Sequence, residues 1–290
     1  MTNLLLCKKN YIKMNFKKIK YKIYTIIKKF NFRFKKFNLT LSLSELGKAY
    51  RTDKYDLGYL DEYERFLGPI RNKAKCIIEI GIGGHDKKES GGYSLKMWSN
   101  YFKKAKIIGL DIVDKSFLNS KRIKTYKCDQ SNPDQINKIT NNISLDLVID
   151  DGSHFVNHQL ISFKTLFPKI KPGGFYIIED TCGSFMKRLG GDPYLKKETT
   201  ISFIKNLVFS CYSNCIIENL TNREINKWIK SIYFWGSKQN NGGIVIVQKG
   251  ENQGQSPNQI NQEKEYLLDF DEYKNYNKKW NKNTSGVFNT

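Results

Sequence analysis

The feature that most constrains this chain is an alternation, between residues 76 and 179, of short apolar runs with longer, helix-like segments. The runs are Cys76–Gly83, Ile107–Ile112, Ile123–Asp129, Leu145–Asp150 and Phe175–Glu179. Strands that alternate with helices form parallel sheets with right-handed crossovers. The pattern therefore predicts a Rossmann-like α/β fold.

Two later apolar runs predict a different pairing. Ser231–Gly236 and Gly243–Gln248 flank the polar loop Ser237–Gly242, which contains the turn residues Asn240, Asn241 and Gly242. Such spacing is typical of a hairpin. We therefore expect the mostly parallel sheet to end in an antiparallel C-terminal hairpin.

The length of 290 residues suits one main domain with extensions. We place this domain at residues 43–250, after a basic arm at 1–42 and before an Asn/Gln/Lys-rich tail at 251–290. Within the arm, apolar residues recur at three- and four-residue steps over Asn15–Phe37, which predicts an amphipathic helix. After Phe30 the residues alternate instead, which speaks against helix there.

The positive charge is unevenly distributed. Of the net charge of +21, twelve basic residues lie within residues 1–40, where there is no acid. Such an arm could contact an anionic membrane surface, or it could be a solvated extension whose lysines reflect an AT-rich genome. No stretch approaches the roughly 20 apolar residues of a membrane span, and Leu4–Leu6 is too short for a signal peptide. We expect a cytoplasmic location, at most peripheral at a membrane.

The six cysteines form no CxxC pair and show no zinc-ribbon spacing. We therefore expect reduced thiols, buried in the fold.

The first half of a predicted site follows the first two strands. Glu79, Gly81 and Gly83 end the first run, and Asp111 ends the second, where an acid can bind ribose hydroxyls. The third glycine of a dinucleotide motif is missing, and the polar loop His85–Gly92 stands in place of an immediate helix. This favours S-adenosylmethionine, which carries no phosphate, over a pyrophosphate cofactor. A tight turn without ligand is the alternative.

The second half lies at the ends of the fourth and fifth strands. Asp150 and Asp151 follow one strand, and Glu179 and Asp180 follow the other, so all four acids face one crevice. Clustered carboxylates repel one another unless a cation or protons compensate their charge, and oxygen ligands favour Mg²⁺ or a similar ion. His154 is the candidate base for a metal-bound hydroxyl. Strand-end capping would explain either acid pair alone.

His154 and His158 are four residues apart, a spacing that on a helix could suggest zinc. Since His154 follows Gly152 in a predicted loop and no cysteine lies beside it, we disfavour this interpretation.

Several stretches together resemble one family. They are YRTDKYDLGYLDEYERFLGPIR, IEIGIGG, GGYSLKMWSNYF, IIGLDI, DQSNPDQ, IDDGSH, LFPKIKPGGFYIIED and the closing SIYFW and GIVIVQKG. The region from Leu46 to Gly250 resembles the metal-dependent sugar O-methyltransferases of the mycinamicin type, which are class I S-adenosylmethionine-dependent methyltransferases with relatives in glycan pathways. The stretches occur in the family's order over about two thirds of the chain.

The resemblance implies roles for particular residues. Asp151, Glu179 and Asp180 would bind Mg²⁺, and His154 would be the general base. The cofactor pocket would be lined by Glu79, Gly81, Gly83, Asp111, Asp129, Gln130 and Asp150, with Asp111 at the ribose and Asp129 and Gln130 near the adenine. The acceptor would be a sugar or glycan hydroxyl, and a homo-oligomer is compatible with the family.

The sequence departs from the family at three places. Arg51 replaces a glycine, the loop after Gly84 carries His85–Glu89, and the region after Cys182 lacks an expected aromatic-rich loop. These departures concern the acceptor more than the chemistry.

Two other enzyme classes compete. A nucleic-acid methyltransferase would suit the pI of about 9.5, but the Asp150–Ser153 segment stands where base-amino methyltransferases carry an Asn/Asp-Pro-Pro-aromatic motif, so nucleic acid is an unlikely partner. A cephalosporin-hydroxylase-like oxidoreductase shares the fold and would insert oxygen instead of transferring methyl. A binding module without activity would bind neither metal nor cofactor.

Overall fold

A computed structural model describes residues 41–194, 196–212, 225, 227–236 and 242–251. The predicted helix Asn15–Phe37 lies outside these residues, as do nearly all of the arm and tail, so their boundaries stay predictions. Within the described part, no helix has the length and apolar character needed to span a membrane.

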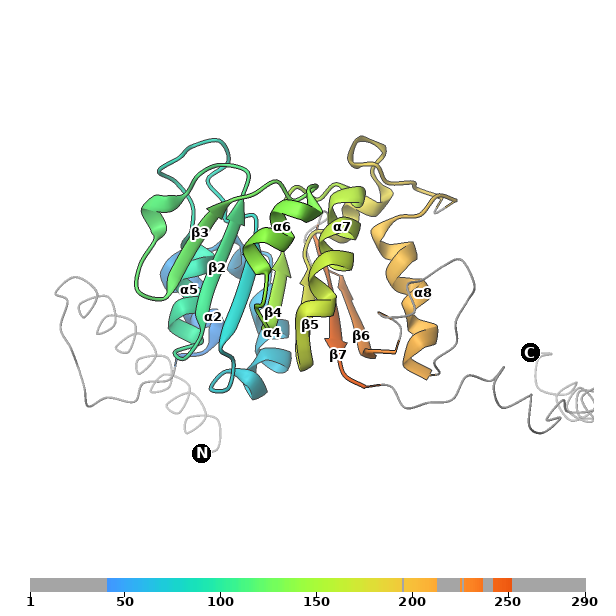
Figure 1. The fold of residues 1–290 in the computed structure, drawn as a ribbon. Coiled ribbons are helices and arrows are strands. Elements are labelled where there is room, and N and C mark those ends of the chain that lie inside the picture. The colour runs from blue at the N-terminus through green and yellow to red at the C-terminus, as the bar shows by residue number, and fades with distance from the viewer. Residues whose placement is uncertain (1–40, 195, 213–224, 226, 237–241, 252–290) are drawn as a thin grey trace, which may run out of the picture.

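The centre of the structure is a seven-stranded sheet in the order β3-β2-β1-β4-β5-β7-β6 (Figure 1). The strands are β1 Cys76–Ile80, β2 Lys106–Asp111, β3 Ile123–Lys127, β4 Leu145–Asp150, β5 Ile170–Ile178, β6 Ile229–Gly236 and β7 Gly243–Lys249. The first five run parallel, and β7 is antiparallel to both β5 and β6. This confirms the predicted α/β fold and its C-terminal hairpin.

Strand β5 begins earlier than the sequence predicts. We expected it at Phe175, but pairing starts at Ile170, opposite Leu145, so that β5 includes Pro172, Gly173 and Gly174. The register then shifts before Leu147, so an irregularity in the ladder accommodates the turn residues within the strand.

Helices cover both faces of the sheet (Figure 1). One apolar core joins the sheet to α2 Leu43–Tyr50, α4 Tyr59–Leu67 and α5 Tyr93–Tyr101. The other joins it to α6 Pro133–Thr140, α7 Val156–Leu166 and α8 Thr200–Tyr212. The short elements are α3 Asp53–Asp56, η1 Gly68–Ile70, η2 Ser116–Leu118, η3 Phe167–Lys169, η4 Thr181–Phe185 and η5 Lys187–Leu189. The parallel sheet is thus buried on both sides, which explains its continuous apolar runs.

The segment before β1 is fixed by local contacts. Ser42 and Glu45 form a reciprocal capping box at the start of α2. At its end, Arg51 adopts the left-handed conformation with φ of 56°, which costs a non-glycine residue about 1–2 kcal/mol. This gives a physical reason for the glycine that the family resemblance expects there.

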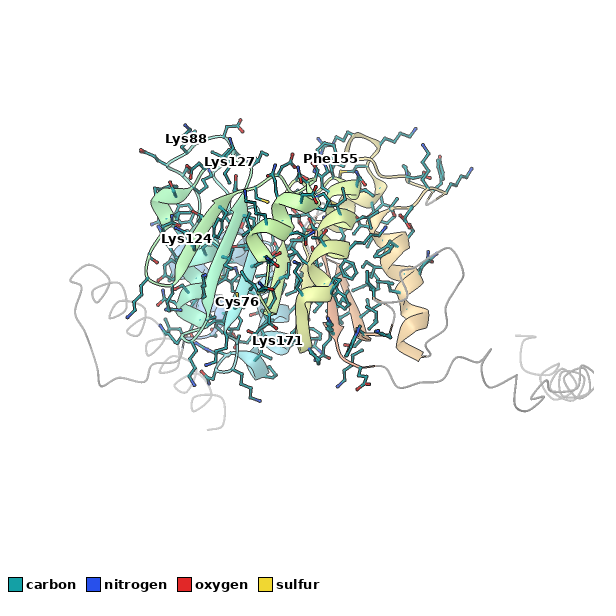
Figure 2. The ribbon with its side chains drawn as sticks, in the orientation of Figure 1. Cys76, Lys88, Lys124, Lys127, Phe155 and Lys171 are labelled. Carbon is teal, nitrogen blue, oxygen red and sulfur yellow. The ribbon has the colours of Figure 1, made fainter. Side chains whose placement is uncertain are left out.

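Figure 2 distinguishes the two ends of the sheet. Lys88, Lys127 and Phe155 lie at the end where the parallel strands finish, and Lys171 lies at the opposite end. Because ligands of open parallel sheets bind at the carboxyl ends of the strands, the Phe155 end is where a site is expected.

Of the predicted reduced cysteines, three fall among residues whose side chains are described. Cys76 and Cys128 are buried free thiols, as expected, whereas the side chain of Cys182 is partly exposed and not buried.

Candidate active site

The carboxyl ends of β4 and β5 carry the acids that the sequence singled out. Asp150 pairs with Ile178 in the sheet, so Asp151 and Glu179 follow at the same level. The amide of Glu179 donates to the carbonyl of Asp150 over 2.9 Å, which locks the two strand ends together. Parallel pairing therefore brings both acid clusters to one place, as predicted.

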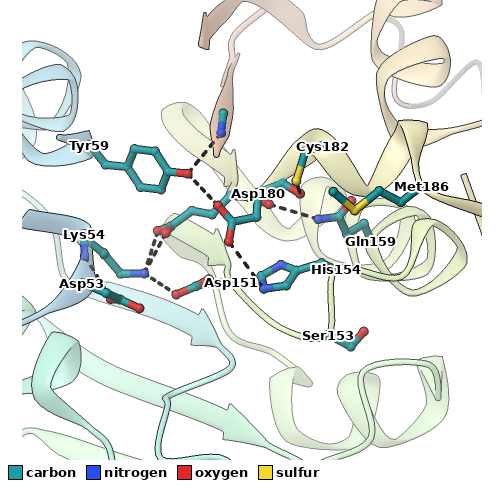
Figure 3. Close-up of polar contacts among 12 residues, drawn as sticks. Asp53, Lys54, Tyr59, Asp151, Ser153, His154, Gln159, Asp180, Cys182 and Met186 are labelled. Carbon is teal, nitrogen blue, oxygen red and sulfur yellow. Dashed lines mark hydrogen bonds and ion pairs between the residues drawn. The ribbon is translucent and has the colours of Figure 1, made fainter. Parts of the chain in front are cut away.

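Three side chains there converge on one point. Donor atoms of Asp151, His154 and Asp180 all lie within 4.8 Å of one another (Figure 3). His154 Nε2 is 3.7 Å from Asp180 Oδ2, and His154 Nδ1 is buried without a hydrogen-bond partner. His154 and Asp180 both have left-handed backbones, with φ of 59° and 50°. Such strain is typical of functional sites, and two carboxylates beside an imidazole fit a divalent cation.

Glu179 belongs to this cluster but faces a different partner. Its carboxylate lies 2.8 Å from Lys54 Nζ and accepts a 2.7 Å hydrogen bond from the Tyr63 hydroxyl. Asp151 also pairs with Lys54, and Glu79 Oε1 lies 3.4 Å from the same ammonium. Lys54 is therefore an internal counter-ion for three carboxylates, and metal binding by Glu179 stays a prediction.

Charge and burial oppose each other in this cluster. Burial alone would lower the pKa of Lys54, but Asp151, Glu179 and Glu79 raise it well above its ordinary value. Burial, and then the charge of Asp151, raise the pKa of Glu179 well above the usual carboxyl range. A group of buried carboxylates with one ammonium carries excess negative charge, which a further cation would relieve.

A second tyrosine of α4 holds the exposed side of the cluster. The Tyr59 hydroxyl donates to Asp180 Oδ1 over 2.6 Å and accepts from the amide of Gly243 over 3.1 Å (Figure 3). Tyr59 and Tyr63 are four residues apart and so lie on one face of α4. This helix thus orients both acids that follow β5.

The predicted cofactor half lies beside this cluster, and the glycines play distinct parts. Gly81 has φ of 73°, and a Cβ there would lie 2.0 Å from the carbonyl oxygen of Asp151. Its role is therefore the close approach of the β1 and β4 loops. Gly83 also has a positive φ, of 72°, but a Cβ would meet only Gly91 at 3.9 Å. The open surface of the turn is thus at Gly83.

Asp111 is held in place at the end of β2. Its carboxylate accepts from the amides of Ile82, over 3.1 Å, and Val113, over 2.8 Å. The exposed side chains of Ile112 and Phe117 follow it in sequence. An acid next to exposed apolar side chains fits a nucleoside, because the ribose hydroxyls can donate to the carboxylate and the flat faces of the base can pack against the apolar groups.

The side chain of Gln130, predicted near the adenine, is held by hydrogen bonds to two neighbouring residues. Its amide nitrogen donates to Asp150 over 2.6 Å, and its oxygen accepts from the Ser153 amide over 3.0 Å. Asp150 also accepts from Tyr176, and burial raises its pKa to about 7. Gln130 therefore ties the end of β3 to the loop that carries His154. Cofactor contact by Asp150 or Gln130 stays a prediction.

Asp129 lies at the partly exposed end of this group. Its carboxylate accepts from the amide and hydroxyl of Ser131, and these bonds lower its pKa. The charged form is thus favoured, and its cofactor contact is also untested.

His158 is turned away from the carboxylates. Its Nδ1 lies 2.7 Å from Ser153 Oγ, and its ring lies 5.2 Å from that of Phe155. Of the two histidines, only His154 joins the donor cluster within the described residues. The four-residue spacing therefore does not bring both histidines into this cluster.

Sequence reasoning missed Lys54, Tyr59 and Tyr63, although all three lie in the YRTDKYDLGYLDEYERFLGPIR stretch that supported the resemblance. The four-residue spacing of the tyrosines indicated one helix face, but nothing indicated what that face contacts.

The topology defines the class of protein. A sheet in the order 3-2-1-4-5-7-6, with a glycine turn after β1 and an acid after β2, is the class I S-adenosylmethionine-dependent methyltransferase fold.

Comparison with known proteins narrows this class. The chain is 39% identical over 171 residues to mycinamicin VI 2''-O-methyltransferase of Micromonospora griseorubida, covering 57% of this chain and 43% of that one. It is 38% identical over 168 residues to 8-demethyl-8-alpha-L-rhamnosyl tetracenomycin-C 2'-O-methyltransferase of Streptomyces olivaceus, covering 57% and 44%. The chain thus spans less than half the length of these relatives. No family model matches it.

Comparison with solved structures also finds a methyltransferase of the mycinamycin pathway. MycE methyltransferase from the mycinamycin pathway, in complex with Mg and SAH, superposes with a TM-score of 0.67 at 30% identity, covering 87% of this chain and 61% of that one. A complex that also holds mycinamycin VI gives a TM-score of 0.64 at 32% identity, covering 74% and 56%. Over the matched residues the chain is therefore similar to MycE methyltransferase in both sequence and fold.

Proposed function

We propose that this protein is an S-adenosylmethionine-dependent, Mg²⁺-assisted O-methyltransferase that acts on a sugar hydroxyl. The observation that carries the proposal is the convergence of Asp151, His154 and Asp180 within 4.8 Å, beside the Gly83 turn. The similar MycE structure was solved with Mg and SAH, which supports this pairing of cofactors.

Each half of the site has a distinct task. Asp151 and Asp180, with Glu179 behind them, would hold the cation, which lowers the pKa of a hydroxyl bound to it. The partly exposed His154 lies 3.7 Å from Asp180 and would accept the hydroxyl proton. On the other side, Asp111 would bind the ribose of the methyl donor.

The acceptor we propose is a hydroxyl of a glycan or of a glycosylated metabolite. Phe155, next to His154 in the chain, is 42% exposed, and Phe185, the last residue of η4 and five residues after Asp180, is 46% exposed. Exposed aromatic faces suit the apolar faces of sugars, as in other small-molecule sites. The curated relatives methylate sugars of natural products, which supports this acceptor class.

Chelation separates the two halves experimentally. Calorimetry after EDTA treatment should still detect binding of S-adenosylhomocysteine, because Gly83 and Asp111 form a site apart from the acids. Transfer of labelled methyl to a panel of glycosides should instead need added Mg²⁺.

A matched pair of variants tests the metal role. Asp151→Asn should abolish Mg²⁺-stimulated turnover with cofactor affinity within a few-fold. Asp146→Asn changes an acid on the same strand, where Asp146 pairs with Lys171 over 3.0 Å at the other end of the sheet, and should keep that stimulation. Full activity in EDTA would exclude the proposed metal role, and oxygen insertion would indicate the hydroxylase-like alternative.

A further inference from the structure

One buried lysine has no part in the chemistry described so far. Lys115 lies in the loop after β2 and is 1% exposed. Its Nζ donates to the carbonyl oxygens of His85, Lys87 and Ser90 at 3.0, 2.6 and 3.1 Å. Among the described residues, no carboxylate forms an ion pair with it. All three ammonium donors are thus used on one loop, and a buried charge is tolerated only when so satisfied.

The loop that Lys115 holds has little else to order it. The side chains of His85–Glu89 are exposed, so this segment cannot be fixed by burial. Its internal backbone bonds are Lys87 N to the Gly84 carbonyl, at 3.1 Å, and Ser90 N to the Lys87 carbonyl, at 3.3 Å. Three carbonyls directed at one ammonium are therefore the main constraint on its shape.

The same loop begins at the proposed cofactor turn. Gly83 and Gly84 lead into it, and a Cβ on Gly84 would lie 2.3 Å from the Ser90 carbonyl oxygen, so the two ends of the loop touch. At its far end, a Cβ on Gly92 would lie 2.3 Å from the Leu118 side chain. The segment Lys115–Leu118 thus fixes both the loop and the residue that precedes α5.

The contact is part of a longer connection between the β1 and β2 loops. Asp111 accepts from the amide of Ile82 at the start of the glycine turn. Four residues after Asp111, Lys115 binds the carbonyl of His85, which is three residues after Ile82. Anything that moves the His85–Ser90 loop also moves the Gly83 turn.

We propose that Lys115 is a positioning residue of the cofactor site, which holds the Gly84–Ser90 loop in its binding conformation before the cofactor arrives. This inference rests on the proposed function, since it assigns the turn to S-adenosylmethionine. A preformed loop spares the binding step the cost of ordering it.

The chain offers a matched control. Lys249, at the end of β7, is 6% exposed and also donates to backbone carbonyls, those of Phe167 and Pro168, at 3.4 and 2.7 Å. It lies at the opposite end of the sheet from the glycine turn, because β7 runs antiparallel to β5. Lys115→Met and Lys249→Met therefore remove the same kind of contact at different places.

The first measurement is S-adenosylhomocysteine binding by calorimetry. If the competent loop conformation falls to a minor population, the apparent Kd rises in proportion, so we expect Lys115→Met to weaken binding about 10- to 100-fold. Lys249→Met should stay within about 2-fold. Unchanged affinity in Lys115→Met, or equal losses in both variants, would overturn the inference. Absence of binding by the unmodified protein would instead refute the proposed function.

The second measurement needs no variant. Hydrogen exchange of the unmodified protein without ligand should already show slowed amides at Lys87 and Ser90, because Lys115 holds the loop. Exchange there at the rate of an open coil, with protection appearing only after S-adenosylhomocysteine is added, would show that the ligand orders the loop, and the inference would be wrong.

Discussion

Replacing Tyr63 by phenylalanine tests whether α4 maintains the acid cluster. The change removes one hydroxyl, which donates to Glu179 over 2.7 Å between two side chains that are 0% and 1% exposed. Leaving a buried acceptor without its donor costs about 1–3 kcal/mol, and water cannot replace the hydroxyl at a buried site. Tyr63→Phe should therefore lower the free energy of unfolding by that amount, as measured by urea denaturation.

The effect on metal binding follows from the same bond. Without the Tyr63 hydroxyl, Lys54 is the one remaining partner of the Glu179 carboxylate among the described residues, so this carboxylate is free to turn away from Asp151. Loss of a group that orients a metal ligand typically weakens binding about 10- to 100-fold. We expect a weakening of this size when Mg²⁺ or Mn²⁺ is titrated calorimetrically.

Tyr101→Phe provides the control. Tyr101 is also 0% exposed, and its hydroxyl donates over the same 2.7 Å to Glu64, a residue of α4 that is not part of the acid cluster. It should lose stability but keep its metal affinity. If both variants bind metal equally well, the tyrosine contacts only stabilise the fold, and the reasoning about orientation is refuted.

Two further predictions concern ionisable groups. His154→Ala should lower kcat by roughly 10²–10⁴-fold, the usual contribution of a general base, whereas His158→Ala should cost far less because His158 pairs with Ser153; equal losses would revive the paired-histidine site. Burial, opposed by Lys54, raises the pKa of Glu79 to about 7 from 4.5, so the folded protein retains a proton that the unfolded chain releases. The contribution of Glu79 to the free energy of unfolding is therefore greatest below the pKa of the unfolded chain, and it is lost as the pH rises from there toward 7. Glu79→Gln should reduce the slope of this loss, measured by urea denaturation at several pH values, by up to about 1.4 kcal/mol per pH unit. An unchanged slope would contradict the raised pKa of Glu79.

The strands and the acids of the site could be predicted because their signals are local. Leu145–Asp150 is apolar until its final acid, and a strand end in a parallel sheet has a fixed place relative to its neighbours. Once the strands were recognised, the meeting of Asp151 and Asp180 followed from topology alone. The loop position of His154 followed from Gly152 just before it.

The contacts around these acids could not be predicted, because they depend on tertiary packing. Lys54 is 97 residues from Asp151 and 125 from Glu179, and nothing in its own neighbourhood indicates burial. The sequence does not distinguish Lys115 from the many other lysines of this basic chain, and its three carbonyl partners are evident only from the structure. The hydrogen bonds of the Gln130 amide to Asp150 and Ser153 were likewise not evident from the sequence, and its cofactor contact stays a prediction.

The docking of α3 and α4 against the acids also bears on how this protein folds. Lys54 and Tyr63 are made early in synthesis, yet their partner Glu179 follows them by 125 and 116 residues. Contacts so distant in sequence form late, because the loop between them must close first. Until β5 is in place, the Tyr63 hydroxyl lacks Glu179 as its acceptor and the Lys54 ammonium lacks one of its three carboxylates. A nascent chain that stops before Glu179 therefore leaves this end of the sheet unfinished. The ion network of the acid cluster is therefore completed only when the segment before β1 and the segment after β5 are both present.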